Sequence, residues 1–519
     1  MLSALIWIPI AGAILMGLLP ANWESRRCRK LALAIAFIPF IWTLWLGIQF
    51  NTLQTHLQFV EYIHWIDWLG LNYHLGVDGL SFPLIFLNSF LTVIAIWISD
   101  RSKERPRFYY SMILLLSAGA AGAFLAQDLL LFFLFYELEI IPLYFLIAIW
   151  GGERRGYAAM KFLIYTALSG ILVLASFLGL VWFSGATTFD YEPLRNQNLP
   201  IELQLALLGM LLVGLFIKIP IFPFHTWLPD AHVEASTPIS VLLAGVLLKL
   251  GTYGLLRFGV GFFLDAWIIL APWLAILAAV SALYGAFTAI AQTDMKKVVA
   301  YSSIAHMAYI LLAAAATTPL SLIAAEFQMV SHGLISALLF TLVGVVYKKT
   351  GTRDVKVLRG LLNPERGLPL TGSLLILGVM ASAGIPGMVG FIAEFLVFRG
   401  AFPIFTIPTI LCIIGTGLTA VYFLLMINRV FFGRLSEQFS QIPPVAFREH
   451  LPSLALTALI LIFGIQPAWV VRWSEAQTTA LIISPALQST IIIEQKEGIG
   501  NRQLGNRQLG NRQQATDIS

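Results

Sequence analysis

The sequence is poor in charged residues and in cysteine. Only 11% of its 519 residues are Asp, Glu, Lys or Arg, whereas 58% are hydrophobic, and this balance excludes a soluble globular domain. The two cysteines, Cys28 and Cys412, lack CxxC spacing, so the sequence predicts no iron–sulfur cluster, zinc site or disulfide. Because GxGxxG, Walker-loop and HExxH motifs are also missing, we expect neither cofactor-binding residues nor metal ligands in this chain.

Long apolar runs are what the sequence does contain. Continuous runs of this kind are typical of membrane-spanning helices and not of membrane barrels. The first run has no basic segment before it and no clear cleavage site, which favours a retained helix over a signal peptide. At about 20 residues per span, we predict an all-α integral membrane protein with about fourteen transmembrane helices, at residues 2–20, 30–50, 78–98, 109–126, 128–150, 158–183, 203–224, 238–258, 266–292, 298–316, 320–346, 369–397, 404–432 and 452–472.

Basic residues fall mainly on alternate connections between these predicted helices. The connections that contain residues 21–30 and 347–368 are examples of the basic set, whereas the opposite connections hold only Arg195, Arg257 and Arg399. The bias is roughly sevenfold, and basic loops stay on the non-translocated side of a membrane. We therefore interpret the net charge of +5 as topology, with both ends of the chain opposite the basic loops and no nucleic-acid partner.

A small set of ionisable side chains lies inside the predicted helices. Each costs about 2.5–3.5 kcal/mol at the bilayer centre, so a residue placed there usually pairs, lines water or carries ions. Acids, lysines and histidines on successive helices have the chemistry of a proton relay. The candidates for the proton path are Glu137, Lys218, Lys249 and Glu394, with His225, His306 and His332 as further relay candidates.

Structural roles are the alternative for each of these residues. A lysine near a helix end can snorkel to the interface, and a single membrane histidine more often makes an interhelical hydrogen bond. Glu139 lies about 200° around a continuous helix from Glu137. We therefore assign Glu137 to the ion pair with Lys218 and leave the roles of Glu139 and Glu326 open. Asp78 is expected to cap the third helix or to make an interfacial contact.

Prolines interrupt two of the runs that carry charges. Pro220 follows Lys218 in the seventh run, and Pro386 with Gly387 precedes Glu394 in the twelfth. A proline removes a helical hydrogen bond, and freed carbonyls are tolerated at membrane depth where they face protein or water. Two broken helices five spans apart predict two inverted five-helix repeats. The predicted units are residues 1–108 (helices 1–3), 109–258 (first repeat), 266–432 (second repeat), 452–472 (helix 14) and 485–519, a polar tail expected to be disordered.

Six motifs, in order, identify a family. They are "FFLFYELEIIPLYFLIAIWGG", "FIKIPIFPFHTWLPDAHVEAST", "LLAGVLLKLGTYGLLRF", "TDMKKVVAYSSIAHM", "FQMVSHGLISALLF" and "GIPGMVGFIAEF". Over about residues 75–435 the chain resembles the antiporter-like, proton-pumping subunits of complex I. It is most similar to the chain 4, or M-type, group in the D-subunit form of the cyanobacterial and chloroplast NAD(P)H dehydrogenase-like complex. The resemblance implies that Glu137 and Lys218, the central Lys249 and the terminal Glu394 carry protons.

The resemblance also implies a function and partners. We expect a proton-translocating subunit without a redox centre, in a thylakoid membrane, with plastoquinone and iron–sulfur clusters held by partner subunits. Other membrane subunits, including neighbouring antiporter-like ones, plastoquinone and lipids are the implied partners. The stretch "HVEASTPIS" departs from the commonest family pattern and slightly favours the paralogue that drives carbon dioxide uptake. The alternative is a subunit of a multisubunit sodium/proton antiporter, which shares these motifs.

Overall fold

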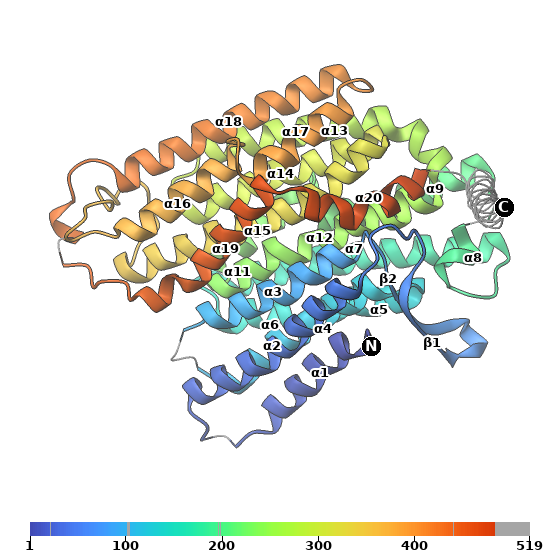
Figure 1. The fold of residues 1–519 in the computed structure, drawn as a ribbon, viewed down its shortest axis with the longest axis horizontal. Coiled ribbons are helices and arrows are strands. Elements are labelled where there is room, and N and C mark those ends of the chain that lie inside the picture. The colour runs from blue at the N-terminus through green and yellow to red at the C-terminus, as the bar shows by residue number, and fades with distance from the viewer. Residues whose placement is uncertain (21, 101–103, 196, 198, 440, 483–519) are drawn as a thin grey trace, which may run out of the picture.

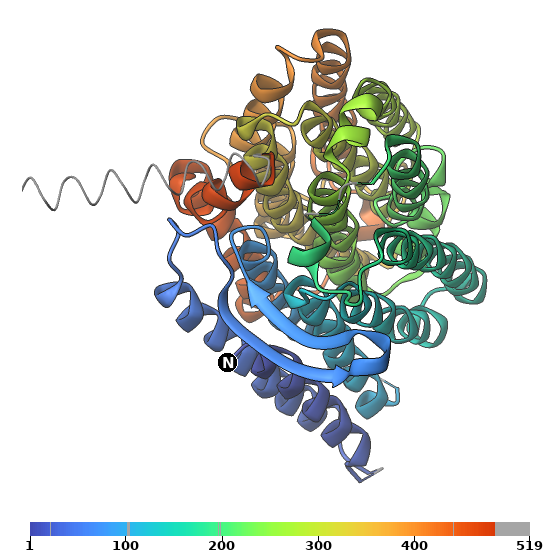
Figure 2. The ribbon, with the colours of Figure 1, turned by 90° about the vertical axis from the view of Figure 1, so that its right-hand side faces the viewer.

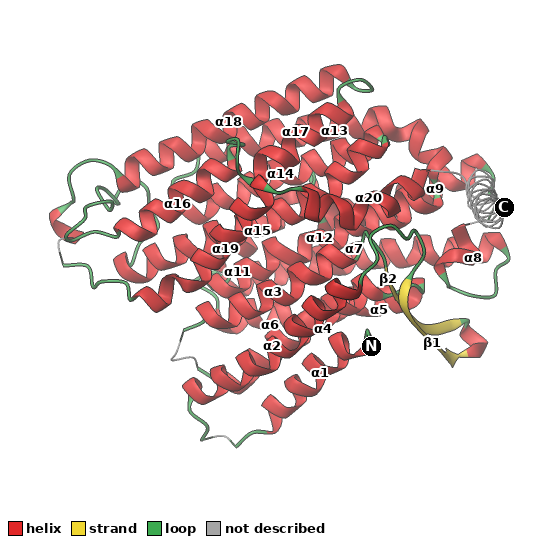
Figure 3. Cartoon of the chain, viewed as in Figure 1, coloured by secondary structure: helices red, strands yellow, loops and turns green. Residues whose placement is uncertain are grey.

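The computed structural model describes every residue except 21, 101–103, 196, 198, 440 and 483–519. The predicted tail at 485–519 therefore lies outside the described residues. Long helices run side by side in one bundle, and a single β-hairpin lies at one end of it (Figures 1 and 3). We call this end the hairpin end and the opposite one, where Lys348, Lys349 and Arg353 lie, the basic end. The prediction of an all-α membrane protein is confirmed apart from the hairpin.

Every predicted run contains a helix. The first part of the chain forms α1 (Ser3–Leu18), α2 (Ser25–Gln49), α3 (Phe82–Ile98), α4 (Pro106–Leu125), α5 (Leu129–Leu138), α6 (Ile140–Trp150), α7 (Arg155–Ser184), α8 (Tyr191–Arg195), α9 (Ile201–Lys218), α10 (Trp227–Glu234), α11 (Thr237–Leu242) and α12 (Leu248–Gly254). The second part forms α13 (Leu264–Ile290), α14 (Met295–Ala316), α15 (Pro319–Thr350), α16 (Pro369–Ser382), α17 (Val389–Ala401), α18 (Thr406–Phe431), α19 (Phe447–Ile465) and α20 (Ala468–Ile482).

Eleven helical segments of the described chain are long and apolar enough to cross a membrane, and three shorter apolar helices, α1, α3 and α16, accompany them. The count of fourteen crossings and the relation between the two repeats stay predictions. The last predicted helix is displaced. The run 452–472 was expected to be one helix, but α19 ends at Ile465, and α20 begins after Pro467, because a proline cannot continue the hydrogen bonding of the helix before it.

Both predicted helix breaks are present. The seventh run stops at Lys218 and resumes as α10 at Trp227, with Pro220 between them. The twelfth run stops at Ser382 and resumes at Val389. Gly387, between these two ends, has φ +91°, a backbone conformation that favours glycine.

Two further interruptions were not predicted. The fifth run breaks at Glu139, between α5 and α6, because Pro142 has no N–H to bond the carbonyl of Leu138 four residues earlier. The eighth run contains two π-helical turns, η3 (Leu243–Leu247) and η4 (Leu255–Val260), on either side of α12. Such turns leave the regular ladder of helix hydrogen bonds and often occur at functional positions. All four interruptions lie in runs that carry buried charges.

The hairpin was missed by the sequence analysis. Strands β1 (Gln58–Ile66) and β2 (Leu71–Val77) pair antiparallel, and Gly70 between them has φ +71°. Figure 2 shows the hairpin lying across the end of the bundle formed by the first helices. The amino terminus of the chain contacts Glu61 of β1. A search for long apolar runs passes over strands of seven and nine residues.

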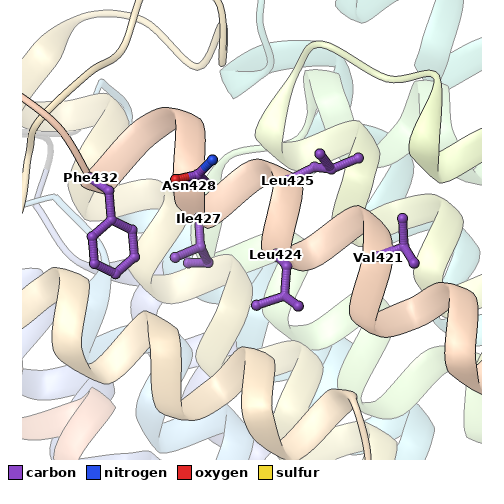
Figure 4. A pocket seen from close by; sticks show the side chains of 6 residues that line it. All are labelled: Val421, Leu424, Leu425, Ile427, Asn428 and Phe432. Carbon is purple, nitrogen blue, oxygen red and sulfur yellow. The ribbon is translucent and has the colours of Figure 1, made fainter.

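Burial separates the central helices from the outer ones. The segment Thr237–Val260 is wholly buried within the bundle, whereas only 39% of the most apolar stretch of α7, and of α18, is buried. The outer face of α18 carries a shallow, mainly apolar hollow lined by Val421, Leu424, Leu425, Ile427, Asn428 and Phe432 (Figure 4). This surface suits lipid tails, and the buried charges lie elsewhere, on the inner helices.

Candidate functional site

Lys218 forms a buried ion pair with Glu139. The lysine ends α9 at the predicted break, and its Nζ contacts Oε1 of Glu139 at the junction of α5 and α6. The two side chains are 1% and 0% exposed. The ammonium group also lies 4.1 Å from the centre of the Tyr136 ring, which adds a cation–π attraction. Snorkelling to the surface is therefore not the role of Lys218.

The predicted partner of Lys218, Glu137, was the wrong carboxylate. The prediction placed Glu137 and Glu139 on opposite sides of one helix, and their backbone is still helical, since Glu139 has φ -73° and ψ -24°. Glu137 lies instead against α7, where a Cβ added at Gly170 would be 2.0 Å from its Oε1. It still interacts electrostatically with Lys218. The lysine is thus flanked by two carboxylates, of which Glu139 makes the contact.

Lys249 lies at the centre of the bundle with no exposed surface. Its Nζ is 2.6 Å from the carbonyl oxygen of Ala244 and 2.6 Å from Nδ1 of His332 on α15. Ala244 belongs to the π-helical turn η3. Because such a turn departs from the regular helix hydrogen bonds, the carbonyl of Ala244 can accept from the Lys249 side chain five residues later. A buried lysine held by two neutral acceptors can pass a proton to the histidine.

Two histidines extend the contact from Lys249 to Glu394. The rings of His332 and His306 are 5.8 Å apart between centres. Nδ1 of His306, on α14, lies 3.2 Å from Oε1 of Glu394, and its Nε2 lies 3.0 Å from the hydroxyl of Ser382. Ser382 ends α16 and Glu394 lies in α17, so the break in the twelfth run brings a hydroxyl and a carboxylate to the same histidine. Lys249, His332, His306 and Glu394 form one buried row, which we call the lateral chain.

The helices of Lys218 and Lys249 touch each other. A Cβ added at Gly251 of α12 would lie 2.7 Å from Cγ1 of Ile219 and 3.3 Å from Cβ of Lys218. Glycine at this position lets the backbones approach closely, as small residues do between membrane helices. The Lys218–Glu139 ion pair therefore lies on a helix that contacts the helix of Lys249, where the lateral chain begins. At this separation the charge of Lys218 can influence the charge of Lys249.

His225 is not part of this row. It lies in a short 3-10 turn between α9 and α10, where its ring stands 4.7 Å from that of Tyr284 and 5.7 Å from that of Phe222, measured between centres. Its Nδ1 has no hydrogen-bond partner among the described residues. The relay role predicted for His225 stays a prediction.

The sequence analysis missed a buried lysine and a buried histidine. Lys296 lies in the connection between the predicted helices 266–292 and 298–316, but it is 3% exposed, and its Nζ donates to the carbonyls of His232 and Ala235 at 3.1 and 2.6 Å. The ring of His232 stacks 4.5 Å from that of Phe340, and it interacts electrostatically with both Lys296 and Lys249. His232 lies in α10, directly after the break of the seventh run, which was the signal available for it in the sequence.

A second buried ion pair lies at the hairpin end. Nη2 of Arg257 is 2.6 Å from Oδ2 of Asp78, and the two side chains are 2% and 1% exposed. Asp78 also accepts the backbone N–H groups of Leu80 and Ser81 at 3.1 Å, in the turn that precedes α3, whereas the N-cap residue of α3 itself is Ser81. Arg257 was assigned to a loop, and that assignment is wrong because η4 buries it. No group of three or more His, Cys, Asp or Glu side chains in the described chain could hold a metal ion.

A family model and individual relatives assign the sequence to the same family. Residues 126–419 match the family model described as "NADH:quinone oxidoreductase/Mrp antiporter, TM". NAD(P)H-quinone oxidoreductase chain 4-2 of Synechocystis sp. is 40% identical over 453 residues, which cover 85% of this chain and 79% of that protein. Chain 4 3 of Trichormus variabilis is 39% identical over 495 residues, which cover 92% of this chain and 91% of that one.

Comparison with solved structures agrees. A chain of respiratory complex I from Thermus thermophilus matches with a TM-score of 0.84 and 27% identity, over 93% of this chain and 99% of that one. A chain of the Mrp complex from Dietzia sp. matches with a TM-score of 0.82 over 92% of this chain and 97% of that one, but at 20% identity this likeness shows a shared fold alone. The chain therefore belongs to the NADH:quinone oxidoreductase/Mrp antiporter membrane family and, within it, to the chain 4 group of NAD(P)H-quinone oxidoreductases.

Proposed function

We propose that this chain translocates protons across a thylakoid membrane as an antiporter-like subunit of a quinone-reducing complex. The observation that carries the proposal is the lateral chain, in which Lys249, His332, His306 and Glu394 make successive buried contacts across four helices. Buried ionisable groups are expensive in a membrane and usually mark a path for ions or protons. A passive scaffold would have no use for such a row.

Each step of the transfer can be assigned to named atoms. The Lys249 ammonium gives a proton to Nδ1 of His332, 2.6 Å away. His332 then releases a proton from Nε2 toward His306, and Nδ1 of His306 passes one to the carboxylate of Glu394. The imidazole suits this role because it accepts at one ring nitrogen and releases at the other. The tautomers follow from these contacts.

The Lys218–Glu139 pair supplies control. While the pair is closed, Glu139 neutralises Lys218, and Lys249 on the adjacent helix experiences little repulsion. When the pair opens, the Lys218 charge is uncompensated inside the membrane, and it disfavours a second positive charge at Lys249. Opening therefore drives the proton of Lys249 toward His332. Glu137, which is also within electrostatic range of Lys218, can stabilise the opened lysine.

The energy for opening would come from partner subunits. The relatives named NAD(P)H-quinone oxidoreductase chain 4 are parts of a larger enzyme, so electron transfer to plastoquinone through iron–sulfur clusters is assigned to other chains. This chain contributes the proton path and contacts with its membrane neighbours. A sodium/proton antiporter shares the fold but needs no quinone chemistry.

The test uses the intact complex in proteoliposomes. Quinone reduction and proton uptake are followed in the same sample for the wild type and for Lys249→Met. We expect the variant to assemble and to pump fewer protons per electron. Equal pumping by the two proteins would refute the proposal. Proton movement that depends on a sodium gradient, with no link to quinone reduction, would support the antiporter alternative.

A further inference from the structure

Glu326 is a buried acid that the lateral chain does not use. It lies on α15, has no exposed surface, and neither of its carboxylate oxygens has a hydrogen-bond partner among the described residues. A buried polar group without a partner is rare and requires an explanation. An isolated charge there would be costly, so the side chain is held as the neutral acid and can exist in a second, ionised state only with a cation beside it.

That cation is Arg257. The groups that interact electrostatically with the Glu326 carboxyl are Asp78 and Arg257, the second buried ion pair of the structure. Nε of Arg257 also lies 3.1 Å from the hydroxyl of Tyr253. The guanidinium contacts Asp78 and lies within electrostatic range of Glu326, so its charge can compensate either acid.

The position of Glu326 connects this cluster with Lys249. Glu326 and Gly333 are seven residues apart, about two turns, and so share one face of α15. Gly333 on this face contacts the eighth run, because a Cβ there would lie 3.1 Å from the carbonyl oxygen of Gly245. Lys249 lies about one turn from Gly245 toward the hairpin end. Glu326 thus faces the helix of Lys249, on the side that leads to the hairpin end.

The C-terminal helix closes the cluster. α20 packs against α15, against η4 and against the start of α3, and a Cβ at Gly79 would be 3.2 Å from Cβ of Gln477. Ser474, Gln477 and Thr478 of α20 share one helix face and are buried, and the amide oxygen of Gln477 has no partner among the described residues. A polar face turned inward at this place suits a hydrated outlet.

We infer that Glu326, Arg257 and Asp78 form a proton outlet from Lys249 and His332 to the hairpin end. This inference rests on the proposed function and adds a branch to it. Protonated Glu326 gives its proton to the Asp78 carboxylate, and Arg257 moves its charge from Asp78 to the new Glu326 carboxylate. Asp78 then releases the proton at the hairpin end and regains Arg257, and Glu326 is reprotonated from the Lys249 side. Each cycle moves one proton and leaves every group as it began.

The test compares Glu326→Gln with Lys249→Met in the intact complex in proteoliposomes. Gln replaces a neutral acid with a neutral amide of the same shape, so the fold is expected to survive. Because positioned proton-transferring groups contribute about 10²–10⁴-fold to transfer rates, Glu326→Gln should remove the share of pumping per electron that leaves through this branch, up to the loss seen in Lys249→Met. Glu326→Asp should restore part of it. Thr341→Val, which alters a buried hydroxyl bonded to its own helix on α15, is the matched control and should pump normally.

The outcomes separate the outlet from the proposed function. Normal pumping by Glu326→Gln, with pumping lost in Lys249→Met, would overturn the outlet and leave the proposed function in place. Normal pumping by Lys249→Met would overturn both. Infrared difference spectra of the wild-type complex during turnover provide a second measurement. A carbonyl band of a protonated acid should change and should be missing in Glu326→Gln, and a wild-type spectrum without such a change would overturn the outlet.

Discussion

The ion pair at Lys218 gives the sharpest prediction, because two neighbouring glutamates can be compared. In Glu139→Gln the lysine loses the carboxylate that it contacts, while both side chains stay buried. Leaving one charge of a buried pair without its partner costs about 3–5 kcal/mol. Since 1.4 kcal/mol is a factor of ten, this corresponds to about 10²- to 4 × 10³-fold in the equilibrium that keeps Lys218 charged. The face of the Tyr136 ring, 4.1 Å away, remains but cannot replace a full charge.

Glu137→Gln is the matched control, since it changes the same atom at a site two residues away and leaves the Lys218–Glu139 contact intact. We expect Glu139→Gln to reduce the number of protons pumped per electron at least about tenfold more than Glu137→Gln does. A tenfold effect corresponds to only part of the cost of an unpaired buried charge, which is about 3–5 kcal/mol. The intact complex in proteoliposomes provides the assay, with quinone reduction as the internal reference. Heat stability of the purified complex should fall in Glu139→Gln and recover in Glu139→Gln combined with Lys218→Met, because removing both charges leaves none unpaired.

The opposite ranking would refute this reasoning. If Glu137→Gln lost pumping while Glu139→Gln retained it, Glu137 would be the working partner, as the sequence alone suggested. A double variant no more stable than Glu139→Gln would show that the two charges are not coupled.

The remaining predictions concern the hinge and the lateral chain. Pro220→Ala should extend α9 past its break and slow proton transfer without changing any charge, and a high-resolution map with no ordered water beside the break would contradict a hydrated hinge. His332→Leu removes the group 2.6 Å from Nζ of Lys249 and should lower pumping by about 10²-fold or more, as loss of a proton-transfer group does; normal pumping would exclude His332 from the path. Glu394→Gln cannot titrate and should impair transfer past His306, whereas Glu394→Asp should keep much of the activity, and full pumping by the Gln variant at normal electron flux would make Glu394 a structural charge.

Much of the architecture could be predicted from the sequence because the membrane simplifies the problem. A backbone in lipid must satisfy its own hydrogen bonds, so long apolar runs have to be helices, and the runs did contain them. Pro220 and Pro386 marked two breaks because a proline removes one hydrogen bond of the helix ladder. Lys218, Lys249 and Glu394 were recognisable as candidates for the site because charge is rare and expensive inside a membrane.

The sequence analysis missed the elements that are not marked by long apolar runs. The strands Gln58–Ile66 and Leu71–Val77 are short, and their pairing depends on a turn and on contacts across the bundle end. α20 was partly counted with α19, although Pro467 separates them. Its buried polar face has meaning only where it covers α15, η4 and α3.

What the sequence by itself determined is the class of protein, the helix positions and the chemical types that lie within the helices. Only the tertiary structure decided the partners. Glu137 and Glu139 point to different sides of the same run, so which of them meets Lys218 depends on where α9 packs around that run. That His332 and His306 join Lys249 to Glu394 depends on how four separate helices pack together, and no spacing within a single helix contains that information.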